Sequence, residues 1–248
     1  MAETFVIAPD FSPERFAGWH MFNTLLQKRS HLSLHLETPS SHEEQEQLIA
    51  DKNPPLVYAN PFDAAELIRK KGYQAVARPI NHSDEMVIVS SAKGDINTLE
   101  QLKPGSKIAM ADNRDVKLIG MRLLEAVDLS ENDVNFEITE NYQAAARTLI
   151  QGKADVAFFM AEVYESLSNL TKSQLHVLIE SDISEISHVL LVKEDFADAQ
   201  SLTDVVLSLK DDADGQAVLA ELGMTSGFEP MNEEDAEFMI DLMATLLD

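Results

Sequence analysis

The 248-residue sequence contains no cysteine. This absence excludes disulfide bonds, thiolate nucleophiles and metal sites with cysteine ligands. Basic residues are also few, because 19 lysines and arginines stand against 43 aspartates and glutamates, for a formal net charge of −24. A nucleic-acid-binding protein needs a basic surface to displace counterions from phosphates. We therefore expect no nucleic-acid partner.

Long apolar runs are missing too. No segment approaches the roughly 20 apolar residues of a membrane-spanning helix, so we expect no membrane insertion. The start of the sequence, MAETFVIAP, lacks the basic and apolar regions of a secretory leader. As written, the sequence predicts a cytoplasmic protein, and the alternative is a periplasmic protein whose leader has been removed. The high negative charge favours a soluble monomer.

Several sequence motifs of enzymes are absent. The sequence has no G-x-S-x-G of hydrolases, no Walker loop and no G-x-G-x-x-G dinucleotide signature. Its seven histidines include one H-x-x-x-H spacing, His31 and His35, but the second of these lies in the strand-like segment LSLHLE, and we expect neither a metal site nor a cofactor. These absences favour a binding protein over an enzyme.

The sequence does contain a regular alternation of strand-like and helix-like segments. Short apolar segments that end at turns, such as TFVIAP and PLVYANP, are followed by amphipathic segments such as FDAAELIRKKG. This order predicts an α/β fold with mainly parallel sheets. The first helix is expected within FSPERFAGWHMFNTLLQKR, with Ser12 at its N-cap and Pro13 at its first position.

A break in this rhythm indicates two lobes. The segment SAKGDINTLEQLKPGS, with its glycines and proline, precedes a second series of strands and helices. The tail then reads as three amphipathic helices with no strand between them, which must pack on a lobe already formed. We therefore expect one lobe from residues 1–88 with 190–248, a second from residues 89–189, and two crossing strands between them.

Several phrases, in this order, resemble the phosphate/phosphite/phosphonate substrate-binding proteins of ABC transporters. They are LVYANPFDAAELIRKKGYQAVARPI, NTLEQLKPGSKIAMAD and AAARTLIQGKADVAFFMAEVY. The resemblance covers about residues 4–245, and its strongest phrase is YANPFD at residues 58–63. It implies a type 2 periplasmic-binding-protein fold, in which two Rossmann-like lobes, joined by a two-stranded hinge, close on a small polar or anionic ligand. It also implies an ABC permease as a partner if the protein is exported.

Two loops depart from the family's pattern. Phosphonate binders carry serine or threonine hydroxyls after the first strand of the second lobe, where this sequence has Asp112-Asn113-Arg114-Asp115. The next loop usually carries a Ser-His pair, where this sequence has Asn141-Tyr142. The resemblance therefore implies a retained scaffold with an altered anion pocket.

Ligands of open α/β sheets bind beyond the carboxyl ends of the strands, which selects four loops. Candidate ligand-binding residues of the first lobe are Ser12, Tyr58, Asn60 and Phe62. Ser12 and Asn60 each have an alternative role as a helix cap. Tyr58, Asn60 and Phe62 together would offer an aromatic wall with an amide.

The second lobe contributes the other candidates, Asn113, Arg114, Asn141, Tyr142 and Glu162. Arg114 would bind a carboxylate on the ligand through two hydrogen bonds, or else lie on the surface without a ligand. Glu162 would suit an amine or hydroxyl on the ligand, or else be stabilised only by the helix dipole. Asp112 and Asp115 have the spacing of a capping box, so we expect these two carboxylates to cap a helix.

The sequence thus predicts a solute-binding protein of the phosphonate-transporter type. The alternatives are a cytoplasmic sensor or an enzyme on the same scaffold, because fold alone does not fix function. For an enzyme, the candidate acids and bases are Glu162, Asp115 and His82, and no motif orders them. A third alternative is a domain that binds a protein through its methionine-rich C-terminal helix.

Overall fold

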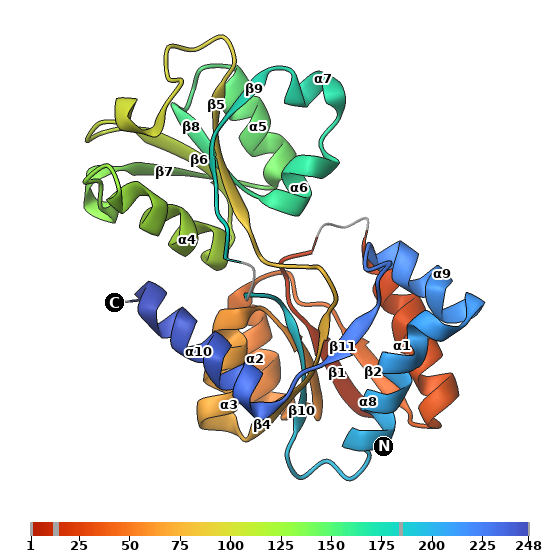
Figure 1. Cartoon of the computed structure of the whole chain (residues 1–248). Helices are drawn as coiled ribbons and strands as arrows, with labels where there is room; N and C mark the ends of the chain where they lie inside the picture. Colours follow the sequence, from red (N-terminus) through yellow and green to blue (C-terminus); the bar gives the residue numbers. More distant parts are fainter. Residues whose placement is uncertain (1, 12–14, 184–185, 248) are drawn as a thin grey trace. The chain divides into compact units, whose positions relative to one another are not determined.

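The computed structural model describes residues 2–11, 15–183 and 186–247 (Figure 1). Ser12 and Pro13, expected at the start of the first helix, lie outside the described residues. The chain divides into two compact units. Unit 1 comprises residues 1–83 and 185–244, and unit 2 comprises residues 84–184 with 245–248. The chain therefore passes between the units three times, the last time within α10 (Glu233–Leu247).

Unit 1 is built on a six-stranded sheet in the order β11-β4-β10-β3-β1-β2. Its strands are β1 (Glu3–Ile7), β2 (Leu34–Glu37), β3 (Leu56–Ala59), β4 (Tyr73–Pro79), β10 (Val189–Lys193) and β11 (Phe228–Pro230). β1 pairs in parallel with β2 and β3, whereas β10 is antiparallel to both β3 and β4. β10 thus inserts between two strands that precede it in the chain by more than a hundred residues.

Helices cover both faces of this sheet. They are α1 (Phe16–Ser30), α2 (His42–Lys52), α3 (Pro61–Lys71), α8 (Ala199–Leu207), the 3-10 helix η4 (Ser208–Asp211), α9 (Ala213–Leu222) and α10 (Glu233–Leu247). α1 packs with α8 and α9, and α3 packs on β3, β4 and β10. The core between α1 and the sheet is aromatic, with the rings of Phe5, Trp19, Phe22 and Tyr58 all buried. Burial of so much apolar area is the main force that holds the unit together.

Unit 2 has a five-stranded sheet in the order β7-β6-β8-β5-β9. Its strands are β5 (Met86–Ser91), β6 (Lys107–Ala111), β7 (Asn135–Thr139), β8 (Val156–Met160) and β9 (Leu175–Glu180). Its helices are α4 (Arg114–Glu125), α5 (Tyr142–Ile150), α6 (Ala161–Ser166) and α7 (Asn169–Lys172), with 3-10 helices η2 (Leu99–Gln101) and η3 (Glu131–Asp133). β6 is parallel to β7 and β8, and β5 is antiparallel to β8 and β9.

Two separate apolar clusters flank the unit 2 sheet, one under α4 and the other under α5. α4 lies close to the sheet because it carries Gly120. A Cβ atom at that position would lie 2.3 Å from Cε2 of Phe158, far inside van der Waals contact. The glycine thus lets the middle of α4 lie close against β8.

The α/β class predicted from the sequence is confirmed, with three corrections. β11 lies in the tail where only helices were expected, because a three-residue strand is too short to show an alternating pattern. The sheets are mixed, since β10 and β5 run against their neighbours. The segment of residues 161–170, AEVYESLSNL, has the pattern of a single helix but forms two, α6 and α7, divided by Leu167 and Ser168, both of which have extended backbone ψ angles.

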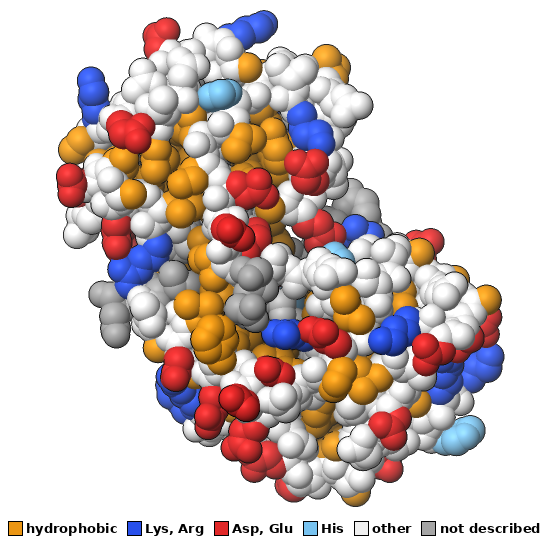
Figure 2. All heavy atoms as spheres, viewed as in Figure 1, with side chains coloured by type: hydrophobic (Ala, Val, Ile, Leu, Met, Phe, Trp, Pro, Cys, Tyr) orange, Lys and Arg blue, Asp and Glu red, His pale blue; other side chains and the backbone are white. Residues whose placement is uncertain are grey.

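Charge is spread over the surface. On the face that Figure 2 shows, acidic side chains are scattered over both units, and lysines and arginines stand singly or in small groups. Among residues 2–11, 15–183 and 186–247, no helix is both long and apolar enough to cross a membrane.

Candidate functional site

The carboxyl ends of β6, β7 and β8 meet at one edge of the unit 2 sheet. Ala111 at the end of β6 lies beside Thr139 at the end of β7, and β6 is also parallel to β8. The Thr139 hydroxyl donates to the carbonyl of Met110 at 3.1 Å and, in an alternative geometry, to that of Asn141 at 2.9 Å. The loops that lead into α4 and α5 are therefore neighbours, as the sequence predicts for this edge.

Each of these two helices begins at an asparagine cap. The side chain of Asn113 accepts a hydrogen bond from the Val116 amide at 2.9 Å, and that of Asn141 accepts one from the Ala144 amide at 2.9 Å. Two helix N-termini with their partial positive charges thus lie side by side. The capping box expected between Asp112 and Asp115 is wrong, because Asn113 takes the cap position and leaves Asp112 exposed before it.

Replacing Asn113 by alanine should lower the free energy of unfolding by about 1 kcal/mol, the usual loss when a capping side chain is removed. Chemical denaturation of both proteins measures this difference. Asn113→Asp, which keeps an acceptor for the Val116 amide, is the matched control and should retain most of the stability. An alanine variant as stable as the wild type would show that the cap contributes nothing.

The candidate residues of unit 2 come together at this edge but differ in exposure. Arg114, at the first position of α4, Asn141 and Glu162, in the first turn of α6, are exposed. Tyr142 is buried, and its ring stacks on that of Phe159 with the centroids 5.8 Å apart. Asn113 is also buried. Arg114, Asn141 and Glu162 are therefore the side chains of this group that a solute would meet first.

The candidates in unit 1 lie at the equivalent edge but are packed inside the unit. Tyr58, Asn60 and Phe62 are 1%, 0% and 5% exposed. The Tyr58 ring lies 4.7 Å from that of Trp19 and stacks on that of His188 at 5.6 Å. Asn60 caps α3 by accepting from the Asp63 amide at 2.8 Å, which is the alternative role predicted for it. The fourth candidate, Ser12, lies outside the described residues.

A cluster of charged and polar side chains at this edge was not predicted. Nε2 of His42 lies 3.0 Å from Oδ1 of Asp10, and its Nδ1 lies 3.5 Å from Oδ2 of Asp63. Nε2 of His188 lies 3.3 Å from Oδ2 of Asp10, which also accepts from Asn60 at 3.2 Å. Gln45 donates to Asp63 at 2.7 Å. The sequence gives no local signal for this cluster, because its members come from four separate segments.

The cluster changes the titration of its members. The carboxylates of Asp10 and Asp63 raise the pKa of His42 to about 10, so the ring is an imidazolium at neutral pH. Burial alone would raise the pKa of Asp10, but contacts with His188 and His42 hold that pKa well below its ordinary value. A cation at the start of α2 is opposed by the helix dipole. His42 therefore owes its charge to the two carboxylates.

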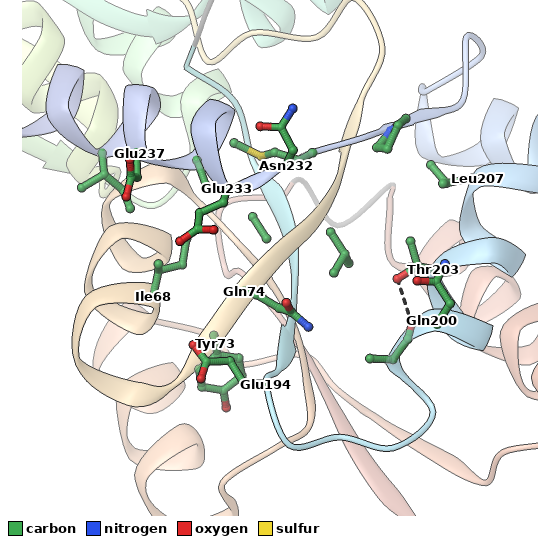
Figure 3. A pocket seen from close by; sticks show the side chains of 17 residues that line it. Ile68, Tyr73, Gln74, Glu194, Gln200, Thr203, Leu207, Asn232, Glu233 and Glu237 are labelled. Carbon is green, nitrogen blue, oxygen red and sulfur yellow. Dashed lines mark hydrogen bonds between the residues drawn. The ribbon is translucent and has the colours of Figure 1, made fainter.

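A hollow of about 580 Å³ lies elsewhere on unit 1 (Figure 3). It is bordered by the start of β4, the residues after β10, α8 and α10, and three of its lining residues are acidic: Glu194, Glu233 and Glu237. The backbone amide of Glu194 donates a hydrogen bond to the carbonyl of Gly72, which lies just before β4. This places the hollow at the edge of the sheet opposite the Asp10 cluster. Because ligands of this architecture bind at the carboxyl ends of the strands, the hollow is not the candidate ligand site.

A comparison with known families identifies the family to which this chain belongs. Residues 5–236 match the family described as "ABC transporter, phosphonate, periplasmic substrate-binding protein". The chain belongs to this family. The resemblance seen in the sequence is confirmed, and so is the prediction of a solute-binding protein rather than an enzyme, since the phosphonate-binding family consists of substrate-binding proteins.

Several solved structures have a fold similar to that of this chain. A binding protein component of an ABC phosphonate transporter from Pseudomonas aeruginosa is 15% identical, with a TM-score of 0.80 over 99% of this chain and 86% of that one. PhnD1 from Prochlorococcus marinus, in complex with methylphosphonate, is 14% identical, with a TM-score of 0.83 over 99% and 98%. XAC2383 from Xanthomonas citri, bound to a chloride ion, is 14% identical, with a TM-score of 0.81 over 99% and 97%. A search of curated protein sequences gave no match.

Metal chemistry has no support at either edge. Within the part of the chain that the structure describes, no group of three or more histidine, cysteine, aspartate or glutamate residues is placed to hold a metal ion. The polar groups described at the two edges make hydrogen bonds and ion pairs.

Proposed function

We propose that this protein collects a small polar solute for an ABC permease, and that the strand-end edge of unit 2 holds the charged group of that solute. The observation that carries this proposal is the pair of capped N-termini of α4 and α5, fastened together through Thr139. Backbone amides at two adjacent helix starts favour an anion. We also propose that the protein acts as a monomer. Its cellular compartment stays a prediction.

Arg114 gives the edge its positive side chain. The residue is exposed at the first position of α4, where its guanidinium can reach an anion placed at the helix start. A guanidinium matches a planar carboxylate through two parallel hydrogen bonds. We therefore propose that the solute carries an anionic group and that Arg114 binds it.

Glu162 supports a second polar group on the same solute. It is exposed in the first turn of α6, which follows β8 directly, so it stands at the same edge as Arg114. A carboxylate at that position suits an amine or a hydroxyl. The proposed solute is thus a small molecule with an anionic group at one end and a hydrogen-bond donor at the other.

A thermal-shift screen followed by calorimetry tests this proposal. The panel contains amino acids and small hydroxycarboxylates such as glycolate and lactate, which carry both groups, together with succinate, which lacks the donor, and small phosphonates. Binding with a stoichiometry of one and loss of that binding in Glu162→Gln or Arg114→Ala would support the proposal. If no compound binds, or if binding is unchanged in both variants, the proposal for unit 2 fails.

Methylphosphonate and phosphite should bind weakly or not at all. The loop before α4 offers asparagine, arginine and two aspartates but no hydroxyl group, and Asp112 is exposed where an oxyanion would approach. The negative charge of Asp112 disfavours an anion with two charges more strongly than the single carboxylate of the proposed solute. Calorimetry at neutral pH checks this expectation. A dissociation constant in the micromolar range for either compound would contradict it.

A further inference from the structure

Asp10 is a buried carboxylate surrounded by donor groups. Its side chain is 1% exposed and follows β1. Around it lie Nε2 of His42 at 3.0 Å, Nδ2 of Asn60 at 3.2 Å and Nε2 of His188 at 3.3 Å. These donors come from the start of α2, the cap of α3 and the residue before β10. Three separate segments therefore converge on one anionic group.

The donors are held in place by contacts that do not involve Asp10. Asn60 is fixed by its hydrogen bonds with Asp63, and the second ring nitrogen of His42 also faces Asp63. The ring of His188 packs on that of Phe11, with the centroids 5.1 Å apart, and stacks on that of Tyr58. Removing the Asp10 carboxylate should therefore leave the donors still directed at the same point.

We propose that His42, Asn60 and His188 form a binding site for a small carboxylate or oxyanion in unit 1, and that Asp10 fills this site with its own side chain. The site, called here the Asp10 cradle, is built as an anion site is built, with an imidazolium as the counter-charge and an amide as a donor around a desolvated centre. Its occupant is covalently attached, so it is never exchanged for a solute.

The cradle makes Asp10 a specificity-determining residue. While its carboxylate is in place, the three donor groups face Asp10 and not an external anion. A buried carboxylate also repels any further anion that approaches it. This inference concerns unit 1 and stands apart from the proposed ligand contacts of unit 2, so each can fail without the other.

Chemical complementation tests the cradle. Asp10→Ala removes the carboxylate and leaves a space the size of formate, whereas Asp10→Gly also removes Cβ and leaves a space the size of acetate. Melting temperatures are measured in sodium formate, sodium acetate and sodium chloride at equal ionic strength. We expect formate to raise the melting temperature of Asp10→Ala by about 3 °C at about ten times its dissociation constant. Acetate should do the same for Asp10→Gly.

The controls separate a cradle from an effect of salt. The wild type and Asp51→Ala, which removes an exposed carboxylate from α2, should respond equally to all three salts. If Asp10→Ala unfolds in chloride, recovery of a cooperative melt in formate supports the cradle, and no recovery in formate counts against it. Equal responses of the Asp10 variants to formate, acetate and chloride would overturn the proposal and leave an ordinary structural ion pair.

Discussion

Replacing His42 by alanine should lower the free energy of unfolding by about 3 kcal/mol, within the range for breaking a buried ion pair. The ring lies between the carboxylates of Asp10 and Asp63, and its side chain is 23% exposed. Without the imidazolium, Asp10 keeps only part of its compensation while remaining buried. Urea denaturation at neutral pH measures the loss. His35→Ala, which removes a histidine that is 66% exposed, is the matched control and should change stability little.

The loss should also depend on pH in a defined direction. Because the pKa of His42 is raised to about 10 in the folded protein, its contribution is complete below its ordinary pKa and is lost as the pH rises toward 10. The difference in stability between wild type and His42→Ala should therefore shrink between about pH 7 and pH 10. A difference that grows or stays constant over this interval would contradict the assignment of an imidazolium.

Replacing Arg114 by alanine should weaken the binding of the best carboxylate from the screen by about 1–3 kcal/mol, because a charged hydrogen-bond partner is lost. This equals roughly a 5-fold to 150-fold rise in the dissociation constant measured by calorimetry. The side chain is exposed on the first residue of α4, so the melting temperature without ligand should barely change.

Arg147→Ala is the matched control for this experiment. Arg147 is exposed in the last turn of α5 and carries the same charge, but it lies at the other end of its helix from the candidate edge. Its loss should leave affinity unchanged. If Arg114→Ala instead lowers the stability of the unliganded protein and leaves affinity unchanged, Arg114 is a structural residue and the proposed site in unit 2 is wrong.

Local patterns were enough to predict most elements of the fold. The asparagine and proline before α3 and the glycine after it mark the ends of that helix, and Asn60 and Gly72 cap it as such residues do. β11 escaped prediction because three residues carry no period. The direction of β10 was also missed, since it depends on how the chain returns to the sheet and not on its own sequence.

The candidate site was predictable only in part. The loops after β6, β7 and β8 were correctly placed at one edge, because parallel strands bring their carboxyl ends together. The Asp10 cluster was missed, because Asp10, His42, Asp63 and His188 are far apart in the sequence and meet only through the order of strands in the sheet. Burial of Tyr58 was missed for a related reason, since the ring that covers it, His188, arrives with β10.

The insertion of β10 between β3 and β4 also affects the order in which the two units can fold during translation. All of residues 84–184 leave the ribosome before β10 does, so unit 2, apart from its last four residues, can assemble while the first sheet is still incomplete. Until β10 arrives, β3 and β4 each present an unpaired edge, and Asp10 lacks His188. Completion of unit 1 is therefore a late event in folding. A nascent chain that stalls before residue 189 would expose the unpaired backbone groups of β3 and β4, which can pair with strands of other proteins.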